Sequence, residues 1–265
     1  MTKEILSSIY DYTLDELKEK LKPSFRAKQV YNWLYKKYAN SYDDMKNLPK
    51  ELIEDLKANY PIDILKVVKK EQSSDGSIKY LFKLRDNHTI EAVLLLMKDK
   101  KIDEDGQIVR SEKYTVCISS QVGCKVGCSF CLTAKGGFVR NLTVGEYIAQ
   151  IVHIKRDNEI AENKALNIVY MGMGEPLDNF DNFVKAVEIF SELDGLAISR
   201  RRQTVSTSGI ASKIKKLGEK DLQIQLAISL HAVDDELRSE LIPMNKAYNI
   251  ASIIEAVKAF PVDTR

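Results

Sequence analysis

Features that would mark a membrane or secreted protein are missing from this 265-residue sequence. No apolar run approaches the roughly 20 residues that a membrane-spanning helix needs. The stretch from Met1 to Lys20 mixes charged and apolar side chains and lacks the apolar core of a signal peptide. A large charge excess is missing too, since 40 basic residues face 38 acidic ones, and this balance neither requires nor excludes a nucleic acid partner. These absences predict a soluble, globular protein of the cytoplasm with no membrane partner.

Cysteine is also scarce, with 4 residues in the whole chain. Three of them, Cys124, Cys128 and Cys131, lie close together, and Cys117 lies just upstream. In a reducing compartment, clustered cysteines favour metal or redox chemistry over structural disulfides. No second cysteine pair accompanies them, and the nearest downstream histidine, His153, falls in an expected helix.

The spacing Cys-x3-Cys-x2-Cys leaves three interpretations open. Structural zinc sites are usually completed by a fourth ligand, which is lacking nearby. A [4Fe–4S] cluster is normally held by four thiolates, so three would leave one iron open for a substrate or cofactor. A disulfide would leave an odd cysteine. The spacing therefore favours an iron–sulfur cluster over zinc and over other roles.

Residues 1–60 are predicted to form a helical accessory domain. Thr13 followed by Glu16 has the pattern of a capping box, and apolar residues recur at helical spacing in SFRAKQVYNWLYKKYA. Residues 61–110 show β-branched alternation interrupted by the turn sequences SSDGS and RDNH, which predicts a small antiparallel sheet. Its last strand contains Glu91, which the pattern alone places at an edge or on an outward face.

Residues 111–265 alternate strands with helices in four successive units. This predicts an α/β fold with a partial parallel (β/α) barrel, in which chemistry lies at the carboxyl ends of the strands. The cysteine loop and the sequences GMGEP, STSG and SLH fall at the ends of the four expected strands. The chain stops at FPVDTR, after a helix, where the alternation calls for another strand. We therefore expect a truncated chain, or one completed by something else.

The three short sequences also have ordinary structural interpretations. GMGEP could be a plain Gly-Pro turn, STSG a helix cap at Ser208, and the lone His231 a satisfied core residue. Alternatively, the GMGEP glycines would let the backbone approach a ligand, and Glu175 would offer a carboxylate to an ammonium group. Only the parallel placement of these sequences with the cysteine loop favours a shared binding site.

Taken together, the motifs resemble a known family. The three-cysteine loop after the first strand of a βα series is similar to the radical S-adenosylmethionine (SAM) superfamily. More narrowly, CISSQVGCKVGCSFCLTAKGGFVRNLT, MGMGEPL, RRQTVSTSGI and LAISLHA resemble the RlmN-type rRNA/tRNA adenine-C2 methyltransferases. FRAKQVYNWLY, SSDGSIKYLF and IPMNKAYNI are similar to that family too, so the resemblance covers nearly the whole chain. Relatives that methylate C8 of the same adenine share most of this pattern, but TAKGGF looks closer to the C2 enzymes.

The resemblance implies two cofactors, a [4Fe–4S] cluster and SAM. Cys124, Cys128 and Cys131 match the cluster ligands, and the open iron would chelate SAM before its reductive cleavage to a 5′-deoxyadenosyl radical. Phe130 resembles an aromatic residue that shields the cluster. The positions that match SAM contacts are Gly174, Glu175, Ser206, Ser229, Leu230 and His231.

The resemblance also implies catalytic roles for Cys117 and Glu91. By itself, Cys117 would be a buried apolar thiol within a strand. In the family, a second cysteine far downstream is methylated and then gives a carbon radical that adds to C2 of adenine. The counterpart of Cys117 resolves the adduct by forming a disulfide. Glu91 matches the family's proton acceptor, a role that suits a carboxylate withdrawn from water.

The implied partners are 23S rRNA, with tRNA as a second candidate, and an electron donor such as flavodoxin; the protein is expected to be a monomer. Lysines and arginines of the helical domain and the barrel mouth would contact phosphate, with the target base flipped into the barrel.

One departure from the family affects these expectations. All the cysteines lie at or before Cys131, so the methyl-carrying cysteine has no counterpart, and neither has an asparagine that contacts SAM near the family's C-terminus. A molecule that ends at Arg265 is therefore not expected to complete methylation. The alternatives are a non-catalytic RNA-binding remnant, an adenine-C8 rRNA methyltransferase, and a radical SAM enzyme that acts on a small molecule.

Overall fold

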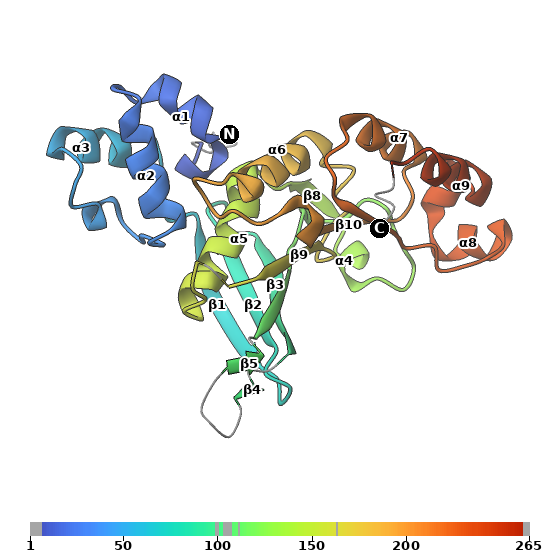
Figure 1. Ribbon diagram of the computed structural model, residues 1–265. Helices are drawn as coiled ribbons and strands as arrows, with labels where there is room; N and C mark the ends of the chain where they lie inside the picture. Colours follow the sequence, from blue (N-terminus) through green and yellow to red (C-terminus); the bar gives the residue numbers. More distant parts are fainter. Residues whose placement is uncertain (1–6, 99–100, 103–107, 111, 163, 262–265) are drawn as a thin grey trace.

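A computed structural model describes residues 7–98, 101–102, 108–110, 112–162 and 164–261. Its centre is a seven-stranded sheet in the order β1-β2-β3-β6-β9-β10-β11 (Figure 1). These strands are β1 (Leu65–Gln72), β2 (Ile78–Leu84), β3 (Thr89–Lys98), β6 (Lys113–Cys117), β9 (Leu166–Tyr170), β10 (Gln203–Thr207) and β11 (Gln225–Ile228). Two short antiparallel pairs lie outside it, namely β4 (Lys101–Ile102) with β5 (Ile108–Arg110), and β7 (Gln121–Gly123) with β8 (Phe138–Asn141).

The central sheet joins an antiparallel half to a parallel half. Strands β1, β2, β3 and β6 pair antiparallel, whereas β6, β9, β10 and β11 pair parallel. The predicted α/β fold with a partial parallel barrel is confirmed. The predicted antiparallel strands are also present, but they extend the parallel sheet through the β3–β6 pairing and do not form a sheet of their own.

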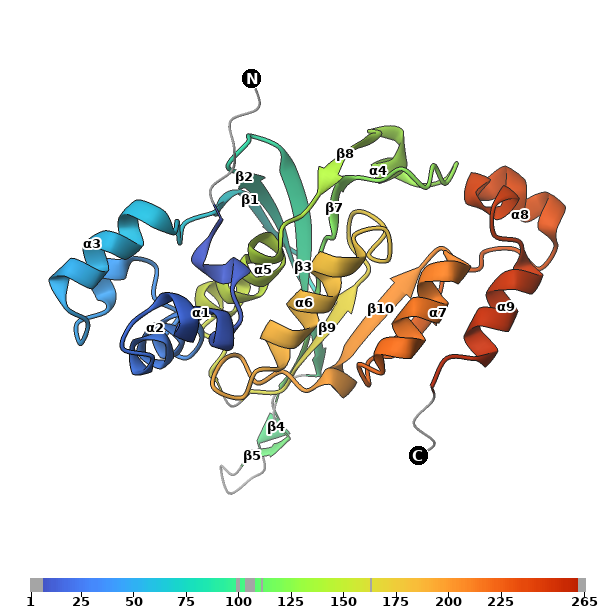
Figure 2. The ribbon, with the colours of Figure 1, turned by 90° about the horizontal axis from the view of Figure 1, so that it is seen from above.

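The helices follow one another along the chain in the order that the sequence predicts. Those of the N-terminal part are α1 (Leu14–Lys20), α2 (Phe25–Tyr35) and α3 (Lys50–Asn59), with the short 3-10 turns η1 (Ile9–Asp11) and η2 (Tyr42–Asp44). Those that follow the parallel strands are α4 (Leu132–Lys135), α5 (Val144–Asp157), α6 (Phe180–Ser191), α7 (Ala211–Lys220), α8 (Asp235–Leu241) and α9 (Ile250–Lys258), with η3 (Arg200–Arg202) and η4 (Pro243–Lys246). Helices α5, α6 and α7 lie along one face of the sheet (Figure 2). None of the described helices is long and apolar enough to cross a membrane.

Local side-chain bonds explain where two of these helices begin. Before α1, the Thr13 hydroxyl accepts from the Glu16 amide at 3.2 Å, and the Glu16 carboxylate accepts from the Thr13 amide at 2.7 Å. The same reciprocal pair forms before α5 between Thr143 and Glu146. Each pair satisfies two amides that a helix start leaves without a partner, so the predicted capping box at Thr13 is confirmed.

The two faces of the parallel strands have different surroundings. On β9, the side chains of Leu166, Ile168 and Tyr170 are buried, and the Tyr170 ring packs edge-on against Phe183 of α6 at 4.8 Å between centroids. The residues between them, Asn167 and Val169, are only half-buried on the opposite face. One face of the sheet therefore forms the core with the helices, and the other face is less deeply buried.

A buried lysine in this core leads to a stability prediction. Lys155 near the end of α5 is 1% exposed, and burial lowers its pKa from 10.5 to about 8. Between these two values the unfolded chain binds a proton that the folded chain lacks, so stability rises with pH in that window. We expect Lys155→Met to raise the free energy of unfolding by about 1–3 kcal/mol at pH 7. Chemical denaturation at pH 7 to 10 should show the wild-type rise flattened in this variant, with the exposed Lys220→Met as an unchanged control.

Candidate active site

A cavity of about 310 Å³ opens at the carboxyl ends of the parallel strands. The residues predicted for the cluster and for SAM that line it are Cys124, Cys128, Cys131, Gly174, Glu175, Ser206, Ser229 and His231. They come from four separate segments at or after the strand ends, which the parallel pairing of β6, β9, β10 and β11 brings to one edge. The fold therefore gathers into one cavity groups that are more than 100 positions apart in the sequence.

The cysteine loop is anchored at its base and on the side next to helix α8. The Cys124 amide donates to the Gly137 carbonyl at 3.0 Å, which brings the ends of the loop together. The Ser129 amide donates to the Leu241 carbonyl at 2.9 Å. Cys124 is buried, whereas Cys128 and Cys131 are half-buried. These contacts hold the loop in place over the cavity.

The thiols in this loop are free, and none is in a disulfide. Burial raises the pKa of the Cys124 thiol to about 11 and also raises the pKa of Cys128. Thiolates are the ligands that iron and zinc bind, so metal loading must displace protons from these groups.

Glu175 is the buried acid of the site, at 3% exposed. One carboxylate oxygen, Oε2, accepts from both the amide and the hydroxyl of Ser208 at 2.8 Å, and Oε1 accepts from the Leu177 amide at 3.1 Å. Burial raises the pKa of Glu175, and the bonds from Ser208 oppose that shift. The Thr207 side chain also hydrogen-bonds to this carboxylate, so Leu177, Thr207 and Ser208 together hold Glu175 at the cavity wall.

The glycines of GMGEP let two loops of the protein cross closely. A Cβ on Gly172 would lie 2.7 Å from the Ile118 carbonyl oxygen, and one on Gly174 would lie 2.5 Å from Gln121 Cβ. Both glycines also line the cavity, so a close approach of their backbone to a ligand stays a prediction. The Glu175 amide in turn donates to Gln121 Oε1 at 2.8 Å, which fixes the acid beside the cysteine loop. The glycines allow this crossing of two loops.

The remaining predicted SAM positions differ in their exposure. The hydroxyls of Ser206 and Ser229 bond to each other at 2.9 Å on the cavity wall. His231 is exposed, and its ring lies 4.7 Å from the Phe130 ring, so the interpretation of His231 as a satisfied core residue is wrong. Leu230 is not among the residues that line the cavity, and its carbonyl accepts from Arg238.

The helix-cap interpretation of Ser208 is also wrong. Helix α7 begins after Ile210 without a side-chain cap, and the Ser208 hydroxyl donates to Glu175. The sequence offered the cap as the ordinary alternative because Ser208 stands just before a helix. Only the fold brings the β9 loop, with its carboxylate, next to this hydroxyl.

Cys117 and Glu91 lie on the less deeply buried face of the sheet, outside the lining of the cavity. Val93 pairs with Cys117 across β3 and β6, so Glu91, two residues before Val93, shares the face of Cys117. Cys117 is half-buried, and burial raises its pKa. The side chain of Glu91 is 45% exposed and lies 3.1 Å from the Lys79 ammonium. The expected withdrawal of this carboxylate from water is therefore not found in this structure.

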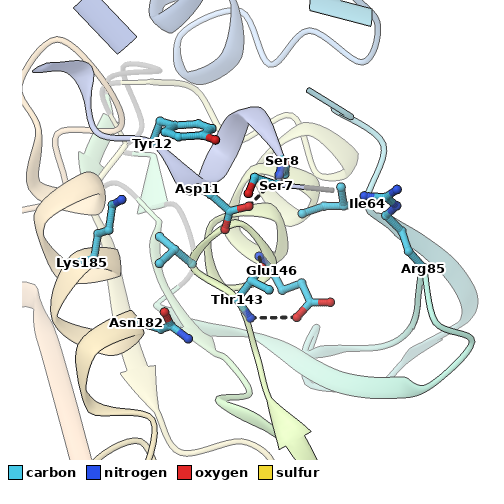
Figure 3. A pocket seen from close by; sticks show the side chains of 11 residues that line it. Ser7, Ser8, Asp11, Tyr12, Ile64, Arg85, Thr143, Glu146, Asn182 and Lys185 are labelled. Carbon is cyan, nitrogen blue, oxygen red and sulfur yellow. Dashed lines mark hydrogen bonds between the residues drawn. The ribbon is translucent and has the colours of Figure 1, made fainter. Parts of the chain in front are cut away.

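A second cavity, of about 340 Å³, lies where the N-terminal segment meets α5 and α6 (Figure 3). Its acidic groups have partners within the protein: Asp11 accepts from the Ser8 and Gly145 amides, and Glu146 accepts from the Thr143 amide. Lys185, on its rim, pairs with Glu16 at 2.7 Å. Of these contacts, Asp11 with Gly145 and Lys185 with Glu16 attach the N-terminal helical module to the barrel.

Comparisons with known proteins agree with this geometry. A family model described as the Radical SAM superfamily matches residues 118–261, and one described as the ribosomal RNA large subunit methyltransferase N-terminal domain matches residues 9–62. The "Dual-specificity RNA methyltransferase RlmN" of Aliarcobacter butzleri is 93% identical over 265 residues, which are 100% of this chain and 74% of that protein. This chain belongs to the RlmN family of radical SAM methyltransferases.

Two further relatives support the assignment. The RlmN protein of Wolinella succinogenes is 66% identical over 258 residues, which cover 97% of this chain and 72% of that protein. The crystal structure of a radical SAM methyltransferase from Sphaerobacter thermophilus superposes with a TM-score of 0.86 at 42% identity, over 96% of this chain and 73% of that one. The relationship therefore extends through the helical module and the barrel alike.

Membership of the family brings a [4Fe–4S] cluster and SAM to this protein, and the residues of the cavity fit them. Among the described residues, no group of three or more His, Cys, Asp or Glu side chains converges on a point where a single metal ion would sit. A zinc site needs such convergence, at about 2.3 Å from each sulfur, whereas a cluster takes one thiolate at each of several irons. The three free thiols that line the cavity therefore suit a cluster better than zinc.

Nothing in the sequence indicated that Arg238 contributes to the site. Arg238 is 1% exposed behind the cavity, although it lies in the strongly charged segment DDELRSE, where a solvated side chain would be expected. Nothing in the local pattern distinguishes it from the charged residues around it. Its burial depends on α8 packing beneath the strand-end loops.

Proposed function

We propose that this protein is a radical SAM methyltransferase that installs a methyl group at C2 of adenine in 23S rRNA and in tRNA. The observation that carries the proposal is the shared cavity, where three free thiols face Glu175 and the hydroxyls of Ser206 and Ser229. Family membership and the named relatives supply the reaction class. The proposal also includes an electron donor such as flavodoxin, a cytoplasmic location and a monomeric state.

In this proposal the cavity residues divide between the two cofactors. Cys124, Cys128 and Cys131 hold the cluster, which when bound supplies the electron for reductive cleavage of SAM. Glu175, which lines the cavity, accepts a hydrogen bond from the amino group of SAM. The six proposed SAM contacts are Gly174, Glu175, Ser206, Ser229, Leu230 and His231, and Phe130 covers one side of the site.

Cys117 and Glu91 are proposed to act on the RNA adduct. They lie on neighbouring strands of the less deeply buried face, where a flipped adenine would enter from solvent. Because burial raises the pKa of Cys117, its sulfur stays protonated and unreactive at neutral pH until a base removes the proton. Glu91 is proposed as the proton acceptor, and substrate entry would have to displace its ion pair with Lys79.

The helical module is proposed to contact RNA phosphate. Lys18 and Lys28 of this module pair with Asp15 and Asp194 at 2.7 and 2.9 Å. Exposed ion pairs of this kind contribute little free energy, so phosphate could replace the acids. Such contacts position RNA without reading its sequence.

The proposal is tested in two stages under anaerobic conditions. The chain is first reconstituted with iron and sulfide and supplied with SAM and a chemical reductant. We expect a brown protein with about four irons per chain that forms 5′-deoxyadenosine. A colourless product that binds only zinc would contradict the proposal.

The second stage tests the methylated position. A longer version, which carries the segments of the Aliarcobacter relative that this chain lacks, is incubated with a 23S rRNA fragment and with tRNA. Mass spectrometry of the digested nucleosides should show 2-methyladenosine. The 8-methyl isomer would favour the C8 alternative, and cleavage of SAM without any methylated RNA would favour the non-catalytic remnant.

A further inference from the structure

Arg238 is a fully buried cation whose hydrogen bonds all go to neutral oxygens. Its guanidinium donates to the backbone carbonyls of Ser208, Leu230 and Tyr248 and to the side-chain amide oxygen of Asn245. These acceptors lie in the loop after β10, the loop after β11, the turn η4 and the segment that enters α9. One side chain thus ties together four segments behind the cavity.

The positive charge of Arg238 has no ion-pair partner among the residues that the structure describes. Asp235 precedes Arg238 on α8. Its carboxylate accepts from the side-chain amide of Asn245 at 3.0 Å and from the backbone amide of Ile250 at 2.9 Å. A buried charge without an opposite charge at ion-pair distance destabilises the fold, and the hydrogen bonds of Arg238 offset part of that effect.

The helix that carries Arg238 also supports the cysteine loop. The Arg238 backbone carbonyl accepts from the Ile242 amide at 2.7 Å. The Ile242 side chain packs with Cys124 and Cys128 in a small apolar cluster. Ser208, whose carbonyl accepts from Arg238, and Ile242 both line the cavity together with Cys124 and Cys128, so the guanidinium lies directly behind the cavity wall.

A second buried charge lies on the other side of Ser208. The Ser208 amide and hydroxyl donate to Glu175, while the Ser208 carbonyl accepts from Arg238. The next residue, Gly209, has φ of +108°, and a Cβ there would lie 3.2 Å from Arg238 Nη2 and 2.4 Å from Ile253 Cδ1. A glycine at this position therefore makes room chiefly for Ile253, and it also leaves space for the guanidinium beneath the cavity.

We infer that Arg238 is a positioning residue that holds the strand-end loops behind the cavity and, by its charge, stabilises the reduced form of the cluster. This inference rests on the proposed cluster at Cys124, Cys128 and Cys131. Each thiolate adds a negative charge to the site, and reduction adds one more, so a buried cation favours the reduced state. Net charge, hydrogen bonding and burial set the reduction potentials of such clusters. Glu175, the buried anion, acts in the opposite direction.

The test is a redox titration of the reconstituted chain without SAM, followed by electron paramagnetic resonance. Arg238→Met removes the charge and keeps a stem of similar length, and Arg238→Lys keeps the charge. The matched control is Arg202→Met, which removes an exposed charge beside the opposite end of β10. We expect the midpoint potential to become more negative in Arg238→Met and to stay close to wild type in Arg238→Lys and Arg202→Met.

A second variant keeps the inference falsifiable if Arg238→Met does not fold. Glu175→Gln removes the buried negative charge and should shift the midpoint potential in the positive direction, with iron and sulfide content unchanged. An unchanged potential in a cluster-loaded Arg238→Met, or an unchanged or more negative one in Glu175→Gln, overturns the inference. A wild-type chain that binds no [4Fe–4S] cluster would instead reject the proposed function, so the two failures are distinguishable.

Discussion

A Cys131→Ser variant is expected to lose the [4Fe–4S] cluster and to cleave SAM more than about 100-fold more slowly than the wild type. A serine hydroxyl does not ionise near neutral pH and so cannot replace the thiolate at an iron. Cys131 is the best of the three ligands for this test, because it is half-buried and stands at the N-cap of α4, where serine is favoured. Iron and sulfide analysis with measurement of 5′-deoxyadenosine would show the loss.

Cys117→Ser is the matched control for this prediction. It exchanges the same atoms on a strand outside the lining of the cavity, so the cluster content and the rate of SAM cleavage should stay at the wild-type level. A full complement of iron in Cys131→Ser, or loss of the cluster in Cys117→Ser, would reverse the assignment of these thiols. Thermal unfolding of both apo variants would show whether folding contributes.

Gly174→Ala is expected to lower the free energy of unfolding by about 2–5 kcal/mol and to abolish SAM binding. Gly174 has φ of +101°, and its new Cβ would lie 2.5 Å from Gln121 Cβ and 2.7 Å from the Gln121 amide nitrogen. Relief of this overlap must separate two loops that now hold Glu175 beside the cysteine loop. Chemical denaturation and SAM titration by calorimetry measure the two effects.

Gly137→Ala is the control that separates the free-energy cost of backbone strain from the cost of steric overlap. Gly137 has φ of +72°, but a Cβ there would meet no atom within 4 Å. Its replacement should cost only about 1 kcal/mol. If Gly174→Ala cost no more than Gly137→Ala and still bound SAM, then the crossing of the two loops would not be what positions Glu175.

The sequence predicted the parts of the protein that depend on short-range order. The spacing of Cys124, Cys128 and Cys131 led to an iron–sulfur cluster, and the alternation of strands and helices led to a parallel sheet with its chemistry at the carboxyl ends. The capping box at Thr13 was predicted correctly because the two hydrogen bonds between Thr13 and Glu16 depend only on the local backbone. The motifs also led to the family to which the chain belongs.

Predictions that depend on packing between distant segments were less accurate. The exposure of Glu91 depends on Lys79, which the pairing of β2 with β3 brings beside it. The hydroxyl of Ser208 bonds to a carboxylate 33 positions away instead of capping the next helix. In both cases the local pattern is compatible with several environments, and the tertiary partner decides between them.

The sequence by itself determined which chemical groups this protein has and the order in which its strands and helices follow one another. Only the tertiary structure decided that the glycines of GMGEP make room for Ile118 and Gln121, and that Arg238 is buried behind the cavity with neutral oxygens as its hydrogen-bond partners. The physical reason is that residue type and spacing fix local geometry and chemistry. Burial and the electrostatic environment of a side chain depend on segments that approach it only when the sheet has formed.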